Sequence, residues 1–370
     1  MLKFISLLMV LLCFSCSSGK VEKTEDDAFV TVDLDAYLES DEDNELSLST
    51  LIDSLEYVPL QTPDDLPVDI LLTVRVSSDD IFVLDRQQRL FRFDRKGRFR
   101  NLIGGRGEGP AEYVSAVDFE VDEAKDAVYV FDIHRKKVKA YRMSGAFWKD
   151  IPVPEGVESI ALVDDSCFIG YRPWYRTGDE TDQCKVFGES VGEIETISFA
   201  RQGKVGEMKV DLLRMPDFSQ VSSASRFRMP FESAIYALSQ DYEVSKEVDF
   251  ELGNHLLPTE VSINNELYNK NLDAPYVFEL KANRFGDFVY MSFFYQKKNR
   301  RVVYDMNTGK FYTVFVGRKP EGIDNDLDGG ATFWPLWFAK DKLIGVLPDD
   351  ALEMKELMEY DNPVLQIGYR

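Results

Sequence analysis

Carboxylates at alternate positions before a glycine form the most suggestive chemical pattern in this sequence. The pattern reads Asp324-Asn325-Asp326-Leu327-Asp328-Gly329. An EF-hand loop spaces its calcium ligands in this way, but its twelfth position is a glutamate that binds through both oxygens. Here the twelfth position is Pro335 and no helical pattern flanks the loop, so an EF-hand is excluded. A looser calcium site formed by Asp324, Asp326 and Asp328 stays open beside the alternative of a solvated turn.

A glycine-rich segment could hold an anion with its backbone amides. It reads Gly104-Gly105-Arg106-Gly107-Glu108-Gly109-Pro110. It lacks the Gly-Lys-Ser/Thr ending and the following helix of a P-loop, and it has no βαβ context for a dinucleotide. Glycines that allow positive φ in a connecting loop are the simpler explanation. Arg106 and Glu108 are nevertheless the candidate ligand-binding residues, because their charges could orient a ligand through strong hydrogen bonds.

Residues suited to catalysis are few. The two histidines, His134 and His255, lack any surrounding signature of a catalytic triad or a zinc site, and both are expected at the surface. Paired carboxylates can hydrolyse glycosides, but among 65 acidic residues some pair is inevitable. We therefore predict no catalytic residue and no cofactor, with calcium as the alternative.

The N-terminus has the pattern of an export signal. Lys3 precedes an apolar run from Phe4 to Phe14, which is too short for the about 20 residues that cross a bilayer. The following Ser15-Cys16 resembles the lipobox of bacterial lipoproteins. That resemblance implies a signal peptide over residues 1–15 and a lipid on Cys16. The charged residues that follow have no apolar periodicity, so residues 16–28 are expected to form an acidic tether. An ordinary secretory signal with an incidental cysteine is the alternative.

Composition limits the partners. The net charge is −22, and phosphate binding needs clustered Lys and Arg, so nucleic acid is not an expected partner. One stretch, Ile81 to Arg106, is basic, with eight Arg or Lys against two Asp. It predicts a solvated outer surface, with an anionic ligand site as the alternative. An exported chain could form a disulfide between Cys167 and Cys184, but two buried free thiols are expected.

An internal repeat organises the chain. Ile81–Asp85 and Leu90–Asp94 read as two strands before a turn on Gly97, and the same pattern returns from Val128 with Asp132 and Gly145. The two aspartates are 47 residues apart and the two glycines 48. Weaker copies contain Ala234–Leu238, Phe288–Ser292 and Arg301–Asp305, and Glu193–Phe199 fits the second strand of a degenerate copy.

This period predicts the fold. Strand–turn–strand units every 40 to 50 residues are typical of propeller blades, and a pair of β-sandwiches would not repeat an aspartate and a glycine at one spacing. We predict an all-β, six-bladed β-propeller over residues 29–370, with one short C-terminal helix at Asp349–Tyr360. A final strand at Val364–Tyr369 should pair with a strand from the N-terminal end, because such closure removes an exposed sheet edge.

Several motifs resemble one family. The segment from Leu102 to Tyr113 resembles the connecting loop of NHL-type propellers. With the lipobox, the stretch at residues 54–62 and Asp361-Asn362-Pro363-Val364-Leu365, the chain is similar to six-bladed β-propeller lipoproteins of Bacteroidetes. The resemblance covers nearly the whole mature chain. Its motifs are specific for the fold and weak for function.

These observations predict an outer-membrane lipoprotein of the cell envelope, facing the periplasm or the surface. We expect a ligand-binding or protein-interaction module whose partner is a glycan, a peptide or an envelope protein. The alternative is a channel-centred hydrolase, lactonase or lyase, with or without a metal, which rests on fold analogy alone. A structural subunit of an envelope complex is a third class.

Overall fold

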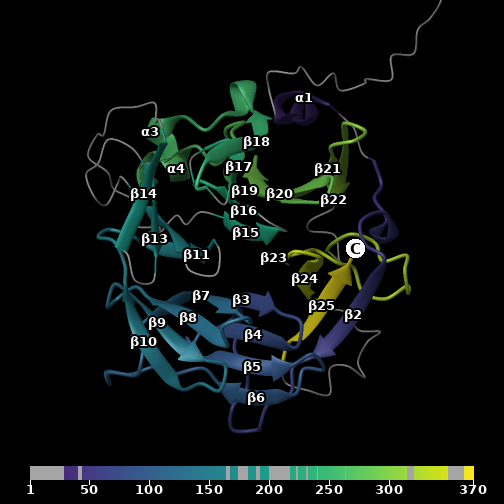
Figure 1. Cartoon of the computed structure of the whole chain (residues 1–370). Coiled ribbons are helices and arrows are strands. Elements are labelled where there is room, and N and C mark those ends of the chain that lie inside the picture. Colours follow the sequence, from purple (N-terminus) through teal and green to yellow (C-terminus); the bar gives the residue numbers. More distant parts are fainter. Residues whose placement is uncertain are drawn as a thin grey trace, which may run out of the picture.

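The computed structural model of the chain describes residues 29–40, 44–163, 167–173, 182–188, 192–199, 217–221, 224–230, 232–239, 241–262, 264–314, 321–348 and 362–370. Six small sheets stand around a central axis as the blades of a β-propeller (Figure 1). The six-bladed all-β fold expected from the repeat is therefore confirmed. The predicted lipid site, the tether and the C-terminal helix lie outside the described residues.

Four blades are built from four consecutive antiparallel strands. Blade I consists of β3 (Leu71–Val76), β4 (Asp80–Asp85), β5 (Leu90–Asp94) and β6 (Phe99–Leu102). Blade II consists of β7 (Ala116–Asp122), β8 (Ala127–Asp132), β9 (Lys137–Arg142) and β10 (Phe147–Pro152). Blade III consists of β11 (Ser159–Leu162), β12 (Cys167–Arg172), β13 (Asp182–Gly188) and β14 (Gly192–Phe199). Blade V consists of β19 (Phe278–Phe285), β20 (Phe288–Tyr295), β21 (Lys298–Asp305) and β22 (Lys310–Val314).

The other two blades take strands from the N-terminal part of the chain. Blade VI consists of β23 (Trp337–Phe338), β24 (Lys342–Val346), β25 (Val364–Tyr369) and β2 (Ser54–Pro59). The antiparallel pairing of β2 with β25 confirms the predicted closure. Blade IV consists of β15 (Asp217–Val221), β16 (Ala224–Arg228), β17 (Ala234–Leu238) and β18 (Val244–Glu251). The strand β1 (Val30–Asp33) joins its outer edge, parallel to β18.

The segment between β1 and β2 runs along the outer side of blade V, and we call it the strap. It contains α1 (Leu34–Glu39) and the 3-10 helix η1 (Leu48–Thr50). The ring of Tyr37 stacks on Phe311 of β22 at 4.7 Å between centroids, and Asn44 donates a hydrogen bond of 2.9 Å to the carbonyl of Phe311. The strap therefore links blades IV and VI across blade V.

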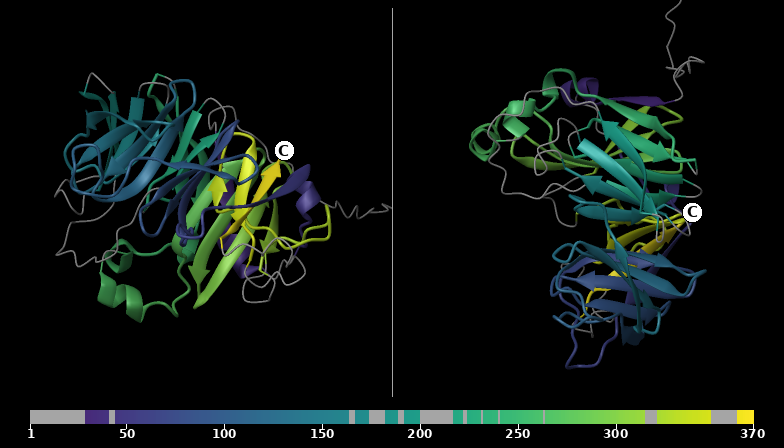
Figure 2. Two further views of the ribbon diagram at one scale, coloured as in Figure 1. Left: turned by 90° about the horizontal axis from the view of Figure 1, so that it is seen from below. Right: turned by 60° about the vertical axis from the view of Figure 1, so that its left-hand side comes forward.

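Short helices also lie between blades IV and V. They are η2 (Gly253–His255), α3 (Thr259–Ser262) and α4 (Asn265–Lys270), and the last two project away from the blades (Figure 2). None of the helices that the structure describes has the length and apolar character to cross a bilayer.

The repeated aspartates stabilise the turns that follow their strands. The carboxylate of Asp85 accepts hydrogen bonds from the backbone N–H and the guanidinium of Arg89, both at 2.9 Å. Asp132 accepts the backbone N–H groups of His134 and Arg135, both at 3.2 Å. Both aspartates are fully buried. An acceptor at the end of a strand satisfies turn N–H groups that have no ladder partner, so the repeat preserves a local hydrogen-bond pattern.

The repeated glycines allow one blade to approach the next. Gly97 and Gly145 have φ of 77° and 89°. A Cβ on Gly97 would lie 2.0 Å from the carbonyl oxygen of Pro59 in blade VI, and one on Gly145 would lie 2.4 Å from that of Leu102 in blade I. Each turn thus packs on the outer strand of the preceding blade, and no larger residue fits there.

Three expectations about individual residues have different outcomes. Cys167 and Cys184 are buried free thiols, as predicted. Glu193–Phe199 is not a second strand but the outermost strand of its blade, because it pairs with β13 beyond β12. His255 is not a surface residue, since it is buried with its Nδ1 2.7 Å from the carbonyl oxygen of Pro275 and its ring edge-on to Tyr295. His134 is exposed, as expected.

Candidate functional site

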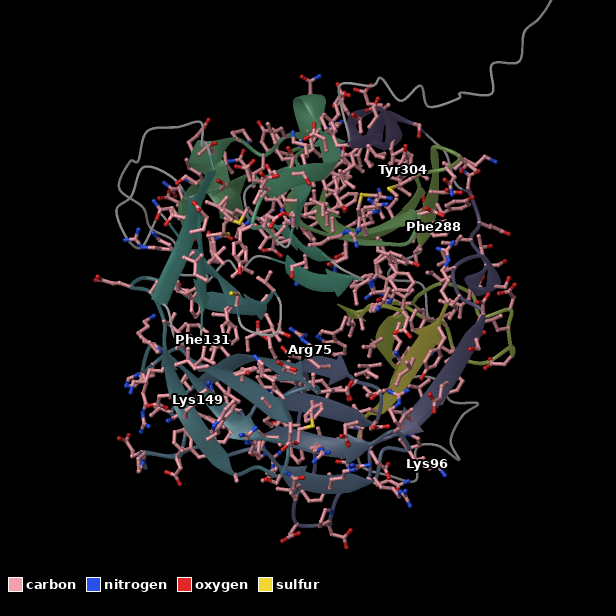
Figure 3. All side chains as sticks on the ribbon, viewed as in Figure 1. Arg75, Lys96, Phe131, Lys149, Phe288 and Tyr304 are labelled. Carbon is pink, nitrogen blue, oxygen red and sulfur yellow. The ribbon has the colours of Figure 1, made fainter. Side chains whose placement is uncertain are left out.

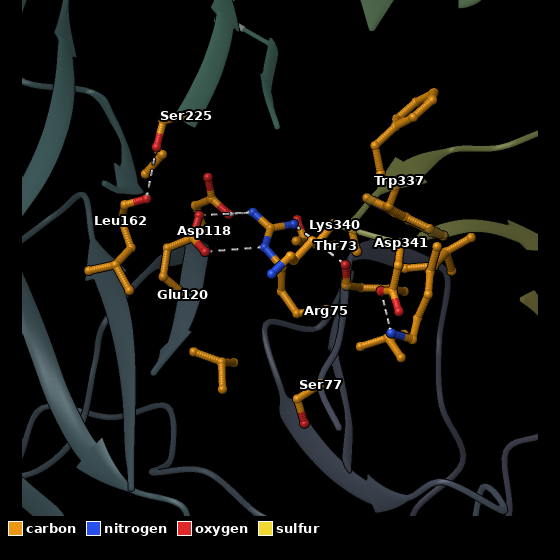
Figure 4. A pocket seen from close by; sticks show the side chains of 18 of the residues that line it. Thr73, Arg75, Ser77, Asp118, Glu120, Leu162, Ser225, Trp337, Lys340 and Asp341 are labelled. Atoms are coloured by element: carbon orange, nitrogen blue, oxygen red, sulfur yellow. Dashed lines mark hydrogen bonds and ion pairs between the residues drawn. The ribbon is translucent and has the colours of Figure 1, made fainter. Parts of the chain in front are cut away.

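The inner strands of the six blades surround a cavity with a volume of about 700 Å³. Each blade contributes lining residues, and the close-up view shows them converging from opposite sides (Figure 4). Small-molecule sites in proteins commonly have volumes of about 300–1,000 Å³. The cavity is therefore large enough to hold a ligand.

Arg75 of β3 is the central charged group of this cavity. Its guanidinium donates two hydrogen bonds to Glu120 of β7, at 3.4 Å from Nε and 3.2 Å from Nη2, and lies 3.6 Å from a carboxylate oxygen of Asp118. The side chains of Arg75, Asp118 and Glu120 are 27%, 20% and 4% exposed. Figure 3 shows Arg75 near the axis, whereas Lys96 and Lys149 lie at the periphery.

Burial makes these three groups interact strongly. Burial and the Glu120 carboxylate raise the pKa of Asp118, Arg75 opposes the shift, and the net result is a pKa of about 7. Burial also opposes the charge of Arg75, but the carboxylates of Glu120 and Asp118 raise the pKa of its guanidinium above the ordinary value. Two carboxylates that share one cation do not ionise equally easily. The pKa of Asp118 is thus raised toward neutral pH because the carboxyl is buried beside a second carboxylate.

Arg75 and Glu120 occupy equivalent positions in successive blades. Arg75 pairs with Phe82 of β4, and Glu120 pairs with Tyr129 of β8. Phe82 and Tyr129 each lie three residues before the repeated aspartate of their blade. Equivalent positions of neighbouring blades lie side by side around the axis, so the repeat places a cation next to an anion there.

A second charged group faces the cavity from blades IV and V. Arg226 of β16 lines the cavity and donates a hydrogen bond of 3.1 Å from Nη2 to Glu247 of β18. Arg284 of β19 lies 3.3 Å from the same carboxylate. Glu247 thus bridges two arginines of neighbouring blades, and Arg226 is the one of the three groups that lines the cavity.

Apolar side chains complete the wall. Leu72 and Leu336 are 45% and 51% exposed although both are large, and Trp337 and Phe338 of the short strand β23 lie beside Leu336. Exposed large apolar residues that cluster mark binding surfaces more often than structural ones. The wall of the cavity therefore combines charged and apolar groups.

Arg106 and Glu108, the residues predicted from sequence, do not line this cavity. They are exposed in the loop between β6 and β7. That loop is held through its carbonyl groups: Arg135 donates to those of Glu108, Gly109 and Glu112 at 2.7–3.0 Å, and Lys139 donates to that of Pro110 at 2.8 Å. The role of Arg106 and Glu108 in ligand binding stays a prediction.

An internal carboxylate occupies the glycine-rich loop. The N–H of Gly109 donates a hydrogen bond of 2.8 Å to Glu112, and a Cβ on Gly107 would lie 2.0 Å from the same carboxylate. The loop thus surrounds an anion of its own chain. The close approach of the Glu112 carboxylate explains why positions 107 and 109 are glycines. Gly104 has a φ of 62°, a backbone conformation that favours glycine.

The aspartate-rich loop anchors the strap. Asp326 accepts hydrogen bonds from the N–H and the hydroxyl of Ser49 at 2.9 and 2.6 Å, and the carbonyl of Asp324 accepts the N–H of Leu48. Asp328 accepts hydrogen bonds from Asn325 and Gly330 within its own loop. Among the described residues, no group of three His, Cys, Asp or Glu side chains is placed to hold a metal ion. Calcium binding by the three aspartates stays a prediction.

The basic stretch is largely paired with acids inside its own blade. Arg89 contacts Asp85, Arg98 contacts Asp94, and Arg92 and Arg100 share Asp80. These pairs account for the local excess of arginine as part of the blade structure. The sequence reasoning missed Arg75, Asp118 and Glu120. A charged residue within the apolar strand before each repeated strand could have indicated them: Arg75 in β3, and Asp118 and Glu120, which are two apart and share one face of β7.

The fold and the cavity define a six-bladed β-propeller with a ligand-sized central site. Residues 29–369 match the family described as a domain of unknown function, DUF4934, so the chain belongs to that family. Among curated proteins, no sequence matches it.

Solved structures with a similar fold include two proteins from Bacteroides. A candidate exported protein of Bacteroides fragilis is 18% identical, with a TM-score of 0.64 over 92% of this chain and 99% of the other. A member of the DUF4221 family from Bacteroides vulgatus is 10% identical, with a TM-score of 0.51 over 86% of this chain and 97% of the other. At these identities the similarity establishes the fold alone.

Proposed function

We propose that this chain is an extracytoplasmic lipoprotein that binds a ligand in the central cavity of its propeller. The observation that carries the proposal is the half-buried Arg75, held by Glu120 and Asp118 in the wall of a cavity of about 700 Å³. Perturbed ionisable groups in a cavity mark functional sites more often than structural ones. Leu72, Leu336 and Trp337 in its wall add apolar surface that a ligand would cover.

Binding is tested by screening the purified full-length protein on glycan and peptide arrays. Arg75→Gln and Glu120→Gln should each weaken the binding of a true ligand at least tenfold. Arg86→Gln is the matched control, because Arg86 is an exposed arginine of the same blade that pairs with Asp69 outside the cavity. Unchanged binding by folded Arg75 and Glu120 variants would exclude the cavity as the binding site. If the protein bound only an intact envelope protein, a protein-interaction surface would be favoured instead.

Tethering is supported by the lipobox-like Ser15-Cys16 after the apolar run and by the candidate exported protein among the structural neighbours. Cys16→Ala should release the protein from membranes of a bacterial host, and the native chain should incorporate labelled fatty acid. Membrane association that survives this change, without fatty acid on the native chain, would contradict the lipid anchor.

A second candidate function is acid–base catalysis in the same cavity. Asp118 favours it, because a carboxyl with a pKa of about 7 can donate a proton near neutral pH. The test incubates the protein with lactone, ester and glycoside panels, with and without a chelator. Turnover that Asp118→Asn abolishes, and that falls above pH 7, would establish an enzyme. Turnover that the chelator removes would add a metal.

A further inference from the structure

A second cavity lies between blades V and VI. Its volume is about 380 Å³, and it shares Asn283, Leu336 and Phe338 with the central cavity. The gap has a simple cause: the inner strand β23 of blade VI has two residues, whereas β19 of blade V has eight. A two-residue strand cannot cover the face of an eight-residue one. We call this opening the side cleft.

Polar residues form a row on the face of blade V that lines the side cleft. Lys281 of β19 pairs with Ser292 of β20, and Ser292 pairs with Arg301 of β21. Paired residues point to the same face of a sheet, and adjacent strands lie about 4.8 Å apart. The hydroxyl of Ser292 therefore lies between the cations of Lys281 and Arg301, and one anionic group can bridge this spacing.

The two cations differ in how far they are neutralised. Arg301 lies over the ring of Trp334 at 5.3 Å and 3.8 Å from Glu321. Burial lowers the pKa of Arg301, and Glu321 raises it. Lys281 is exposed and has no ion-pair or hydrogen-bond partner within the described part of the chain. Glu279, the other acid of the cleft, accepts a hydrogen bond from Tyr268. Arg300 also borders the cleft, so the described residues leave two cations there, Lys281 and Arg300, without an ion-pair partner.

The apolar side of the side cleft includes a polar atom without a partner. Tyr290 is 2% exposed, and its ring makes edge-on contacts with the rings of Trp334 and Phe338. Its hydroxyl is buried and has no hydrogen-bond partner among the described residues. A buried hydroxyl without a partner is unfavourable, so an acceptor supplied from outside would be stabilised there. Leu336, half-exposed at the junction of the two cavities, offers apolar contact beside it.

We propose that the side cleft binds an organic anion with an apolar ring face. Lys281, Ser292 and Arg301 would bind the anionic group, and the ring would pack against Leu336 and Phe338. An acidic saccharide and an aromatic acid share this chemistry. The inference goes beyond the proposed role of the central cavity, because its anion-binding residues, Lys281, Ser292 and Arg301, do not line that cavity.

The test titrates the purified full-length protein with the fluorescent anion 8-anilinonaphthalene-1-sulfonate. Lys281→Glu should weaken binding at least tenfold, and raising the salt concentration should weaken it in the native chain. Lys310→Glu is the matched control, because Lys310 is an exposed lysine of the same blade outside the cleft. Arg75→Gln should leave this binding unchanged, so failure of the central site and failure of the side cleft give different results.

Competition then assigns the source of the anion. Digalacturonate and phenylacetate are each compared with an uncharged counterpart, galactobiose and phenylacetamide. Displacement by an acid at a concentration at least tenfold below that of its neutral counterpart supports the proposal and identifies the class. Equal effects of the two lysine changes, equal displacement by acids and neutral counterparts, or no displacement by either acid would overturn it.

Tyr290→Phe gives a separate readout. If the hydroxyl has no partner in the free protein, its removal should not lower the unfolding temperature, yet it should weaken binding of the displacing acid severalfold. A lower unfolding temperature with unchanged binding would remove Tyr290 from the site.

Discussion

The glycine-rich loop at residues 104–113 and the inner strands β3 and β7 both carry charged residues in blades I and II, but they place them differently. In the loop, Arg106 and Glu108 point to solvent, and the backbone is held by Arg135, Lys139 and an internal carboxylate. In the strands, Arg75, Asp118 and Glu120 meet in a cavity. Two charges interact more strongly where water is partly excluded than in bulk solvent. Charged residues on a strand that faces the axis are therefore a better guide to a candidate site than charged residues in an exposed loop.

The largest effect should come from Arg75→Ala. It leaves Glu120, which is 4% exposed, and Asp118 without their cation, and breaking a buried pair in this way costs several kcal/mol. Because Arg75 is itself partly exposed, we expect the free energy of unfolding to fall by about 2–3 kcal/mol. Denaturant unfolding measures it. A loss below about 0.5 kcal/mol, as expected for a surface ion pair, would mean that the charged residues of these strands stabilise the fold no more than those of the loop.

The pH dependence of stability should identify Asp118. Its pKa is raised in the folded protein from 3.8 to about 7, so the folded state binds more protons than the unfolded state between these values. The stabilisation from Asp118 is therefore present below pH 4 and is lost as pH rises to about 7. Asp118→Asn should flatten the unfolding free energy across that window. An unchanged slope would mean that Asp118 titrates as an ordinary carboxyl.

The aspartate-rich loop extends the comparison to blade V. Asp326→Ala should lower the unfolding temperature modestly, because it removes the two hydrogen bonds that hold the strap at Ser49. If the loop serves only to hold the strap, calcium should change the unfolding temperature very little, both in the native chain and in the variant. A calcium-dependent rise that Asp326→Ala abolishes would instead establish the looser calcium site of Asp324, Asp326 and Asp328.

The smallest effect should come from Arg106→Ala. Its exposed side chain has no partner among the described residues, so we expect the free energy of unfolding to change by less than about 0.5 kcal/mol. A ligand found on the arrays should lose less than tenfold in affinity. If Arg106→Ala abolished binding while Arg75→Gln did not, the loop rather than the axis would be the binding site.

Much of the fold was predictable because its signals are local. Asp85 and Asp132 each stabilise a turn within four residues, so the turn and its aspartate recur together in the sequence. The final strand, Val364–Tyr369, has the predicted bounds, since an apolar run after Asn362-Pro363 has no helical alternative. Blade III was misassigned because β12 and β13 lack this aspartate and glycine pattern.

The sequence by itself determined the blade repeat and its turns, because alternation and turn residues act over a few positions. Closure of the ring followed from the rule that proteins avoid exposed sheet edges. Only the tertiary structure decided which charges meet. Arg75 and Glu120 are 45 residues apart, and Ser49 and Asp326 are 277 apart. Nothing near Lys281 or Tyr290 in the chain indicates that a two-residue β23 leaves their face of blade V open. Contacts between blades depend on how whole sheets pack, and a local pattern does not encode that packing.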